Sequence, residues 1–348
     1  IEDGVAMGGA GSAVLETLSE LGIGVPTLVM GIKDQFVPQG GIDDLMRDNE
    51  LDSESVVRRI REALLIKPLV DLKPLNTMAV SAKARYFTKV EKLDELRLVL
   101  DFAARKKVKP FILGGGSNLL IVNNFIDRLV IQMAFSGFVV NKTDRTVELG
   151  AGEEWHEVVK RILALGWGGL ENLALIPGTV GGAVVQNIGA YGAEVAQFVR
   201  SIKVYDPAQD AVKEFTNEHC NFAYRRSGFK TEEGSGLIVL SVTLAFDEHW
   251  KPNLSYKELA NAFTDVEPTP ELIFEAVVTA RSRKLPDPKV LPSAGSFFKN
   301  PIVTKEVFQE LLAKFPSIVH YPLAGGREKL AAGWLIEQAG LKGVRVGA

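Results

Sequence analysis

Apolar residues recur every three or four positions in several segments of the chain, which is the spacing of one face of an α-helix. The predicted helices are a segment with Ala10, Val14, Leu18 and Leu21 on one face, a segment with Val56, Ile60 and Leu64 facing inward, and the ranges 91–105, 153–165, 270–283, 304–315 and 328–339. Ser53 or Ser55 is placed to cap the second of these helices. In the last one, Leu330 and Trp334 keep helical spacing.

Other segments have the pattern of strands. Residues 236–246 alternate cleanly, with every second side chain from Ile238 to Phe246 apolar. Shorter apolar runs predict strands at Pro26–Met30, 111–113, 129–133, 146–149 and 202–205, and the final VRVGA resembles the beginning of another strand. Because strands and helices follow no regular βαβ repeat, the pattern favours an α+β fold over a doubly wound parallel sheet.

Two glycine-rich stretches interrupt this pattern. Residues 171–192 (ENLALIPGTVGGAVVQNIGAYG) contain five glycines and are too irregular for one helix and too apolar for an ordinary surface loop. Residues 111–120 (FILGGGSNLL) have the same character. Taken alone, GGGSN could be a tight turn. Two such loops in one domain suggest instead a large anionic cofactor held by backbone N–H groups.

The chain divides into three segments at changes of composition. Residues 1–65 hold one predicted strand and two helices, too little to close a core alone, and two prolines between Lys67 and Pro74 mark a boundary. Residues 66–247 carry both glycine-rich stretches. A linker with Trp250 and Pro252 then leads into the third segment, 248–348.

Composition excludes several classes of function. A net charge of −3 and 46% hydrophobic residues argue against a nucleic-acid-binding protein and leave enough apolar material for real cores. One cysteine, Cys220, permits no intrachain disulfide and fits a reducing cytoplasm, where we expect this protein. The four histidines lack metal-ligand spacing, so we expect no metal. No apolar run reaches 18 residues, so we expect no membrane span.

Three polar residues in apolar surroundings are candidates for chemistry. Arg225, in FAYRRSGFK, could hold a carboxylate through two parallel hydrogen bonds, or could form a surface ion pair. Ser296, in AGSFFKNP, could present its hydroxyl into a pocket or be a turn residue. Lys284, in RKLPDPK, could bind substrate or end a solvated helix. Each becomes persuasive only together with the others.

The joint pattern of residues 68–348 resembles the UDP-N-acetylenolpyruvoylglucosamine reductases, the flavoenzymes of peptidoglycan precursor synthesis. The matching runs occur in the family's order: NTMAV, ILGGGSNLL, GAGEEWHEVV, GLENLALIPGTVGGAVVQNIGAYG, FAYRRSGFK, RKLPDPK, AGSFFKNP and KLAAGWLIEQAGLKG. The resemblance implies an FAD-binding domain of the vanillyl-alcohol-oxidase (PCMH) type and an α+β substrate-binding domain. It also implies that NADPH reduces FAD and that a monomer reduces UDP-N-acetylglucosamine enolpyruvate to UDP-N-acetylmuramate, with small molecules as its only partners.

The same resemblance assigns residues to the cofactor. The first loop would cradle the FAD pyrophosphate with backbone N–H groups, and the stretch from Ile176 to Gly192 would line the flavin. The implied cofactor-binding residues are Gly114, Gly115, Gly116, Ser117, Asn118, Pro177, Gly178, Gly181, Gly182, Asn187, Gly189, Ala190, Tyr191 and Gly192.

It assigns the remaining candidates to catalysis and to substrate. Arg225 would stabilise the enolate-like charge that develops when hydride adds to C3, and Ser296 would donate the proton to C2. Lys284, Asn300 and Tyr256, the last in the loop LSYKEL, would hold the UDP-sugar. Tyr224 would orient the substrate side of Arg225.

The ends of the chain depart from that pattern. GGAGSAV and VPTLVMGIKDQFVPQG, within residues 1–65, resemble the C-terminal end of 1-deoxy-D-xylulose-5-phosphate synthase, a small α/β fragment of a transketolase-type domain. At the other end, the catalytic glutamate that the reductase family places near its C-terminus lies in a segment after the last residue here. We therefore expect a fusion truncated at its C-terminus, which binds FAD and turns over weakly or not at all.

Three further interpretations compete with the reductase. A different flavin oxidase of the same fold would need covalent attachment through His156 or Cys220, and neither lies in such a motif. An FAD-binding but catalytically inactive fusion fragment is the non-enzyme alternative. Thiamine-dependent synthesis would need diphosphate-binding domains that nothing in these residues resembles.

Overall fold

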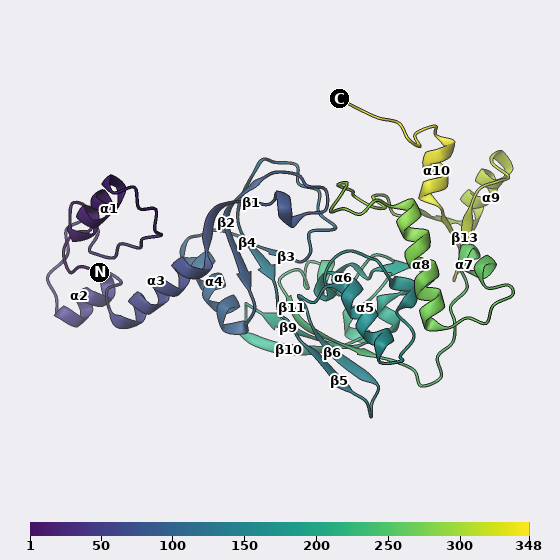
Figure 1. The fold of residues 1–348 in the computed structure, drawn as a ribbon, viewed down its shortest axis with the longest axis horizontal. Helices are drawn as coiled ribbons and strands as arrows, with labels where there is room; N and C mark the ends of the chain where they lie inside the picture. The colour runs from purple at the N-terminus through teal and green to yellow at the C-terminus, as the bar shows by residue number, and fades with distance from the viewer. Residues whose placement is uncertain (348) are drawn as a thin grey trace. The chain divides into compact units, whose positions relative to one another are not determined.

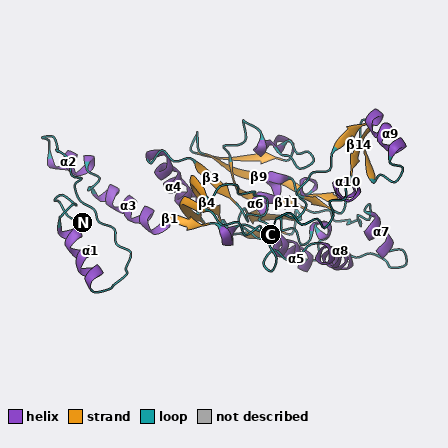
Figure 2. Cartoon of the chain, turned by 90° about the horizontal axis from the view of Figure 1, so that it is seen from above, coloured by secondary structure: helices purple, strands orange, loops and turns teal. Residues whose placement is uncertain are grey.

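The computed structural model describes residues 1–347, which form two compact units, 1–292 and 293–347. The first unit contains two main sheets (Figures 1 and 2). The smaller sheet has the order β1-β2-β4-β3, formed by Lys67–Asp71, Lys83–Val90, Phe125–Met133 and Pro110–Leu113. β1 is antiparallel to β2, while β2, β4 and β3 run parallel.

The larger sheet is antiparallel and has five strands. Its order is β10-β9-β11-β6-β5, formed by Ala211–Thr216, Val199–Asp206, Ile238–Ala245, Thr146–Gly150 and Phe138–Asn141. The predicted strand in 236–246 is confirmed, but its side chains do not share one face. Val239 is buried as well, and after a register shift between Val239 and Ser241 the buried Val242 and Leu244 belong to a different core from Ile238 and Leu240. Both sheets and their sparse βαβ content confirm the predicted α+β class.

Helices cover these sheets because each has one apolar face. α4 (Leu93–Arg105) buries Leu96, Val99 and Phe102 in a core that also contains β4 residues. α5 (Trp155–Ala164), α6 (Val180–Gln186) and α8 (Pro270–Lys284) share the core of the larger sheet, where Trp155 is fully buried. α7 (Lys257–Ala262) packs on α8. The predicted helices 91–105, 153–165 and 270–283 are confirmed.

Shorter elements complete the first unit. Two two-residue strands, β7 and β8, form a hairpin, and five 3-10 turns connect the larger elements. Their bounds are Gly189–Ala190 and Ala193–Glu194 for the hairpin, and η1 Lys73–Leu75, η2 Glu171–Leu173, η3 Val195–Gln197, η4 Glu218–Cys220 and η5 Gly228–Lys230 for the turns. No helix among residues 1–347 is both long enough and apolar enough to span a membrane.

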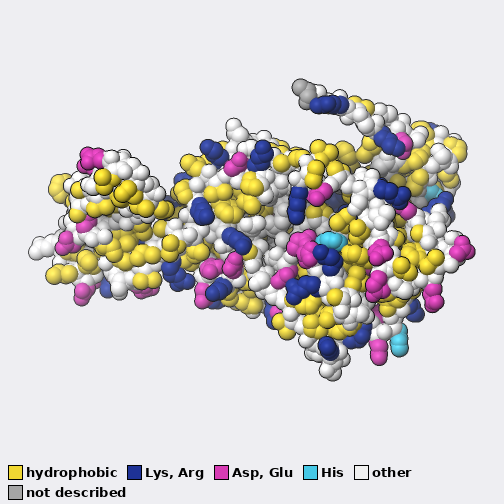
Figure 3. All heavy atoms as spheres, in the orientation of Figure 1, with side chains coloured by type: hydrophobic (Ala, Val, Ile, Leu, Met, Phe, Trp, Pro, Cys, Tyr) yellow, Lys and Arg dark blue, Asp and Glu magenta, His cyan; other side chains and the backbone are white. Residues whose placement is uncertain are grey.

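The N-terminal segment forms both predicted helices but not the predicted strand. α1 (Ala10–Glu20), α2 (Ile42–Asp48) and α3 (Ser53–Leu65) form, but Pro26–Met30 is not a strand. The nearest bridge joins Val5 to Ile32, and the Met30 carbonyl accepts a single backbone hydrogen bond from the Glu2 N–H at 2.9 Å. Apolar side chains therefore remain on the outside of this segment (Figure 3). Phe36 is fully exposed.

α3 faces the protein with a different side than predicted. Its Ile60 and Leu64 are exposed, whereas Glu62 is buried between Arg58 of the same helix and Arg105 of α4. Burial raises the pKa of the Glu62 carboxyl, and Arg105 acts against that rise. The cap is Asp52, whose Oδ1 accepts from the N–H groups of the next turn at 3.1 Å, and neither predicted serine.

The second unit is a small sheet with two helices. Its strand order is β12-β14-β13, formed by Ile302–Thr304, Arg327–Leu330 and His320–Leu323, and α9 (Lys305–Lys314) confirms the predicted helix 304–315. The predicted helix 328–339 begins later, as α10 (Ala332–Gln338), because Leu330 pairs within the sheet. Val344–Gly347 form no strand, and Ala348 lies outside the described residues.

Candidate active site

The two glycine-rich stretches meet in the structure. A Cβ on Gly115 would lie 2.8 Å from the Cα of Gly178, so the loops approach as closely as their backbones allow. The Ser117 hydroxyl donates to the Pro177 carbonyl at 3.1 Å and ties them together. Sequence reasoning placed both stretches at one cofactor, and the fold brings them to one place.

This junction offers unused backbone donors. Within residues 1–347, the N–H groups of Gly115, Gly116, Ser117, Gly178 and Thr179 donate no hydrogen bond. The first loop packs closely against Leu75. Gly116 has φ +63°, and a Cβ added to it would lie 1.9 Å from the Leu75 carbonyl oxygen. A set of free N–H groups on a fixed backbone suits the oxygens of a phosphate or pyrophosphate.

The start of α5 anchors the second loop. The Trp155 N–H donates to the Gly178 carbonyl at 3.0 Å, and the Val180 N–H donates to the Glu153 carbonyl at 2.9 Å. The indole of Trp155 also donates to the Leu173 carbonyl at 2.9 Å, from a fully buried position. The loop is therefore held on both sides of Gly178 by groups that cannot move without opening the core.

Arg225 lies against the far end of the glycine-rich stretch. Its guanidinium donates to the carbonyls of Asn187, at 3.3 Å, and Gly189, and its Cζ lies 5.1 Å from the centre of the Tyr224 ring. It forms no ion pair with any carboxylate among residues 1–347, so the surface-ion-pair alternative does not describe this side chain. A half-buried cation whose charge is not neutralised is suited to hold an anion.

Asn187 fixes the end of the second glycine-rich stretch, whose residues from Ile176 to Gly192 are called the wall below. It is fully buried with φ +46°, and its amide donates to Glu194 and to the Ala223 carbonyl, each at 2.9 Å. Its Oδ1 accepts from the Ala196 N–H at 3.2 Å. The side chain is thus occupied within the protein, and it fixes the carbonyl that Arg225 contacts.

The proposed substrate residues of the first unit gather beside the same wall. The rings of Tyr191 and Tyr256 meet edge to face with centres 5.0 Å apart. Lys284 is paired with Glu258, whose hydrogen bond raises the pKa of the Lys284 ammonium. Burial raises the pKa of the Tyr191 phenol, which therefore stays protonated at neutral pH.

The remaining two predicted residues belong to the second unit. Ser296 is exposed in an irregular loop, next to Gly295 with φ +59°. Asn300 accepts through Oδ1 from the Ala332 N–H at 3.0 Å and so satisfies the first N–H group of α10.

Two residues at this site were missed by sequence reasoning. Arg281 of α8 lies near Tyr191, makes no ion pair within residues 1–347, and has its pKa lowered by burial. His156 accepts through Nδ1 from the Leu175 N–H at 3.0 Å. A signal was present for His156, which lies inside the motif GAGEEWHEVV, whereas Arg281 lies two residues before the motif RKLPDPK and had none.

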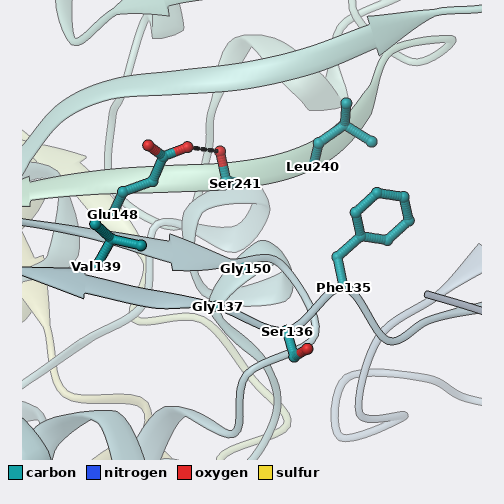
Figure 4. Close-up of a pocket in the computed structure, with 8 residues that line it drawn as sticks. All are labelled: Phe135, Ser136, Gly137, Val139, Glu148, Gly150, Leu240 and Ser241. Atoms are coloured by element: carbon teal, nitrogen blue, oxygen red, sulfur yellow. Dashed lines mark hydrogen bonds between the residues drawn. The ribbon is translucent and has the colours of Figure 1, made fainter. Parts of the chain in front are cut away.

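A separate cavity of about 300 Å³ lies on the larger sheet and contains none of the predicted site residues (Figure 4). Its one carboxylate, Glu148, accepts from Ser241 at 2.8 Å and from Lys203 at 2.7 Å. Because that charge is already neutralised, and because the free donors and cations lie elsewhere, the candidate site is at the loop junction.

The chain is similar to known proteins over most of its length. A family described as "FAD binding domain" matches residues 84–215, and one described as "UDP-N-acetylenolpyruvoylglucosamine reductase, C-terminal domain" matches residues 287–348. The UDP-N-acetylenolpyruvoylglucosamine reductase of Shewanella sediminis is 43% identical over 284 residues, which are 81% of this chain and 82% of the relative. The corresponding protein of Paraburkholderia phymatum is 45% identical over 285 residues, 80% of this chain and 82% of its own length.

A solved structure shows the same likeness. The crystal structure of the UDP-N-acetylenolpyruvylglucosamine reductase from Thermus caldophilus is similar with a TM-score of 0.55 and 28% identity, covering 80% of this chain and 81% of that one. Together with the first family match, it confirms the predicted FAD-binding domain within an α+β fold.

Proposed function

The chain belongs to the UDP-N-acetylenolpyruvoylglucosamine reductase family, and from this we propose that it is an FAD-dependent oxidoreductase that uses NADPH to reduce UDP-N-acetylglucosamine enolpyruvate to UDP-N-acetylmuramate. The observation that carries the proposal is the junction of the two glycine-rich loops, with its free N–H groups, together with the unneutralised Arg225 at the far end of the second stretch.

The loop junction fits the cofactor. We assign the pyrophosphate of FAD to the N–H groups of Gly115, Gly116, Ser117, Gly178 and Thr179. The wall from Ile176 to Gly192 would lie along the flavin, with Asn187 keeping its backbone fixed. Once bound and reduced by NADPH, FAD supplies the hydride for C3 of the enolpyruvyl group.

Arg225 and Ser296 are the residues we propose for the chemistry. Negative charge builds on C2 and its carboxylate as the double bond is reduced, and a guanidinium in a half-buried site stabilises such charge strongly. Carbonyl contacts to Asn187 and Gly189 hold that guanidinium in place. We assign the proton that C2 receives to the hydroxyl of Ser296.

We propose that four polar residues, two of them aromatic and one of them basic, bind the substrate. Tyr224, Tyr256, Lys284 and Asn300 keep the roles that the family resemblance implies. The cations at the end of α8 support the choice, because a UDP-sugar carries a diphosphate.

The reductase assignment is tested with purified protein. A visible flavin spectrum after reconstitution with FAD, followed by NADPH oxidation that depends on the enolpyruvyl sugar nucleotide, is the expected result. A protein that stays colourless in excess FAD contradicts the FAD site. A yellow protein without substrate-dependent NADPH oxidation supports the inactive-fragment alternative.

Gly115→Ala is expected to weaken FAD binding by about tenfold or more. The added methyl would lie 2.8 Å from Gly178, so the two loops must separate and their N–H groups diverge. The measurement is the dissociation constant of FAD from flavin fluorescence. Gly236→Ala is the control, since nothing lies within 4 Å of its Cβ position. Equal affinity of the two variants would contradict the assignment of the pyrophosphate to this junction.

We propose the domain organisation 1–65, 66–247 and 248–348 for this function. The FAD-binding match over 84–215 lies inside the second segment, and the match over 287–348 lies inside the third. For residues 1–65 we propose a packing or docking role without synthase chemistry, in keeping with their resemblance to the end of a transketolase-type domain. Their many exposed apolar side chains support this.

Because this role does not involve the cofactor, a substitution within residues 1–65 is expected to leave the FAD site intact. Replacing the exposed Phe36 with serine is expected to leave FAD affinity within about twofold of the unaltered chain, since a solvent-exposed side chain contributes little to folding. The measurement is again flavin fluorescence, with a thermal melt as the folding check. A large loss of FAD affinity in a folded protein would show that this segment supports the site.

A further inference from the structure

We propose that His156 is a positioning residue that holds the FAD-contacting loop through a hydrogen bond formed only by its neutral imidazole, which makes cofactor affinity depend on pH. The inference rests on the proposed function, because it concerns the same loop. It adds a residue and a form of control that the family resemblance did not assign.

The first observation is the contact itself. The Leu175 N–H lies 3.0 Å from Nδ1 of His156. A backbone N–H can only donate, so Nδ1 must carry a lone pair and the proton of the neutral ring must be on Nε2. An imidazolium would place an N–H against an N–H, and the bond would be lost.

The second observation is the backbone that this bond holds. Leu175 has φ +58°, a left-handed conformation that costs a residue with a Cβ of order 1–2 kcal/mol. Such a conformation persists only where its surroundings impose it. Here the Trp155 indole holds Leu173 and His156 holds Leu175, so consecutive residues at the start of α5 fix the segment.

The third observation is where the segment leads. Pro177, two residues on, accepts from Ser117, and Gly178 packs on Gly115. A change of backbone at Leu175 therefore moves the second loop relative to the first. The free N–H groups on both loops would no longer converge on one anion.

The imidazole is placed by its surroundings. Its ring is stacked on Phe274 of α8, with centres 5.5 Å apart and planes within 1° of parallel. The ionisable groups near it are Glu154, Glu157 and Lys160 of its own helix and Arg281 of α8, while residues 173–178 carry none. Burial is the main influence and lowers the pKa of His156, with the two glutamates acting against it.

The sign of the pH effect follows. With a pKa below the ordinary value of about 6.5 for histidine, the ring is neutral at pH 7 and the contact is complete. The lowered pKa means that the contribution of this group to stability is present above about pH 6.5 and is lost as pH falls through the folded pKa. FAD affinity is expected to fall in the same window.

The test compares two substitutions in the full-length protein. His156→Asn keeps an acceptor near the position of Nδ1 and cannot titrate, whereas His156→Phe keeps a ring to stack on Phe274 and has no acceptor. FAD dissociation constants are measured between pH 5 and 8. Wild-type affinity should fall about tenfold towards pH 5, and the Asn variant should bind with a flat profile within about threefold of wild type at pH 8.

The Phe variant should bind about tenfold more weakly at all pH values. Hydrogen exchange of the peptide 173–178 in the FAD-free protein gives a second readout, with faster exchange expected in the Phe variant only. A residue that merely fills space would reverse this order and favour Phe over Asn. If the Phe variant does not fold, the pH profile of the Asn variant decides.

Two outcomes overturn the inference alone: a wild-type chain whose FAD affinity does not change with pH, or an Asn variant that keeps the wild-type pH dependence. A wild-type chain that binds no FAD at pH 8 overturns the proposed function and this inference with it.

Discussion

Ser296→Ala is expected to lower product formation by about 10²–10⁴-fold while flavin reduction by NADPH stays unchanged. The hydroxyl is proposed to give the proton to C2, a step that follows hydride transfer and has no part in the oxidation of NADPH. Stopped-flow absorbance of the flavin separates the two half-reactions: its bleaching reports reduction, and its return on adding the enolpyruvyl sugar nucleotide reports substrate reduction.

Ser293→Ala is the matched control. It removes a hydroxyl three positions away in the same loop, where Ser293 accepts from the Gly295 N–H at 3.0 Å. Product formation in this variant should stay within a few-fold of the unaltered chain. If both half-reactions decline together in the Ser296 variant, the proton-donor role is wrong and the side chain is needed for the fold of the loop.

Arg225→Met should lower kcat by about 10²–10³-fold, the usual effect of removing one group that stabilises developing negative charge. Methionine keeps much of the length of the side chain and removes the charge. Because Arg225 also contacts the carbonyls of Asn187 and Gly189, FAD affinity must be measured in parallel. We expect that affinity to change only a few-fold, since Asn187 holds the wall through its own amide.

Arg226→Met provides the comparison. This neighbouring cation is exposed, and its loss should leave kcat nearly unaltered. Arg225→Lys should be more active than Arg225→Met, because lysine keeps the positive charge but lacks the forked donor geometry of the guanidinium. A variant of Arg225 with normal kcat and raised KM would contradict charge stabilisation and would assign the residue to substrate binding alone.

The main helices and the α+β class could be predicted because their signals are local. The range 153–165 puts its apolar residues on one face, and the strand around Val242 alternates, so period alone identifies both. The meeting of the glycine-rich loops could also be anticipated, since two stretches with the same unusual composition suggested one shared ligand.

The errors arose where distant residues decide. Pro26–Met30 has the composition of a strand but lacks neighbours with which to form a ladder. α3 turns its polar side inward because Arg105, 43 residues away, binds Glu62, and no local pattern reveals that partner. Leu330 and Trp334 fit a helix by spacing, yet pairing with β13 places Leu330 in a strand.

At the site, the residue types could be predicted from the sequence, but the contacts that each side chain makes could not. Arg225 could be singled out as a cation in apolar surroundings, but its contacts with two carbonyls depend on the left-handed turns at Asn187 and at Arg225 itself. The same holds for His156. Its role depends on the left-handed conformation of Leu175, and the sequence has no glycine at that position to indicate such a conformation.

The junction of the two loops also bears on how the protein acquires its cofactor. The hydrogen bond from Ser117 to Pro177 joins residues 60 positions apart, so neither loop presents a phosphate site until both sheets have formed and docked. Such non-local contacts form late and slowly in folding. FAD must therefore select the native chain over every partly folded form, and its binding energy adds in full to native stability, about 2.7 kcal/mol at a free concentration one hundred times its dissociation constant. Flavin supply would then govern how long the folded protein survives as well as whether it is active.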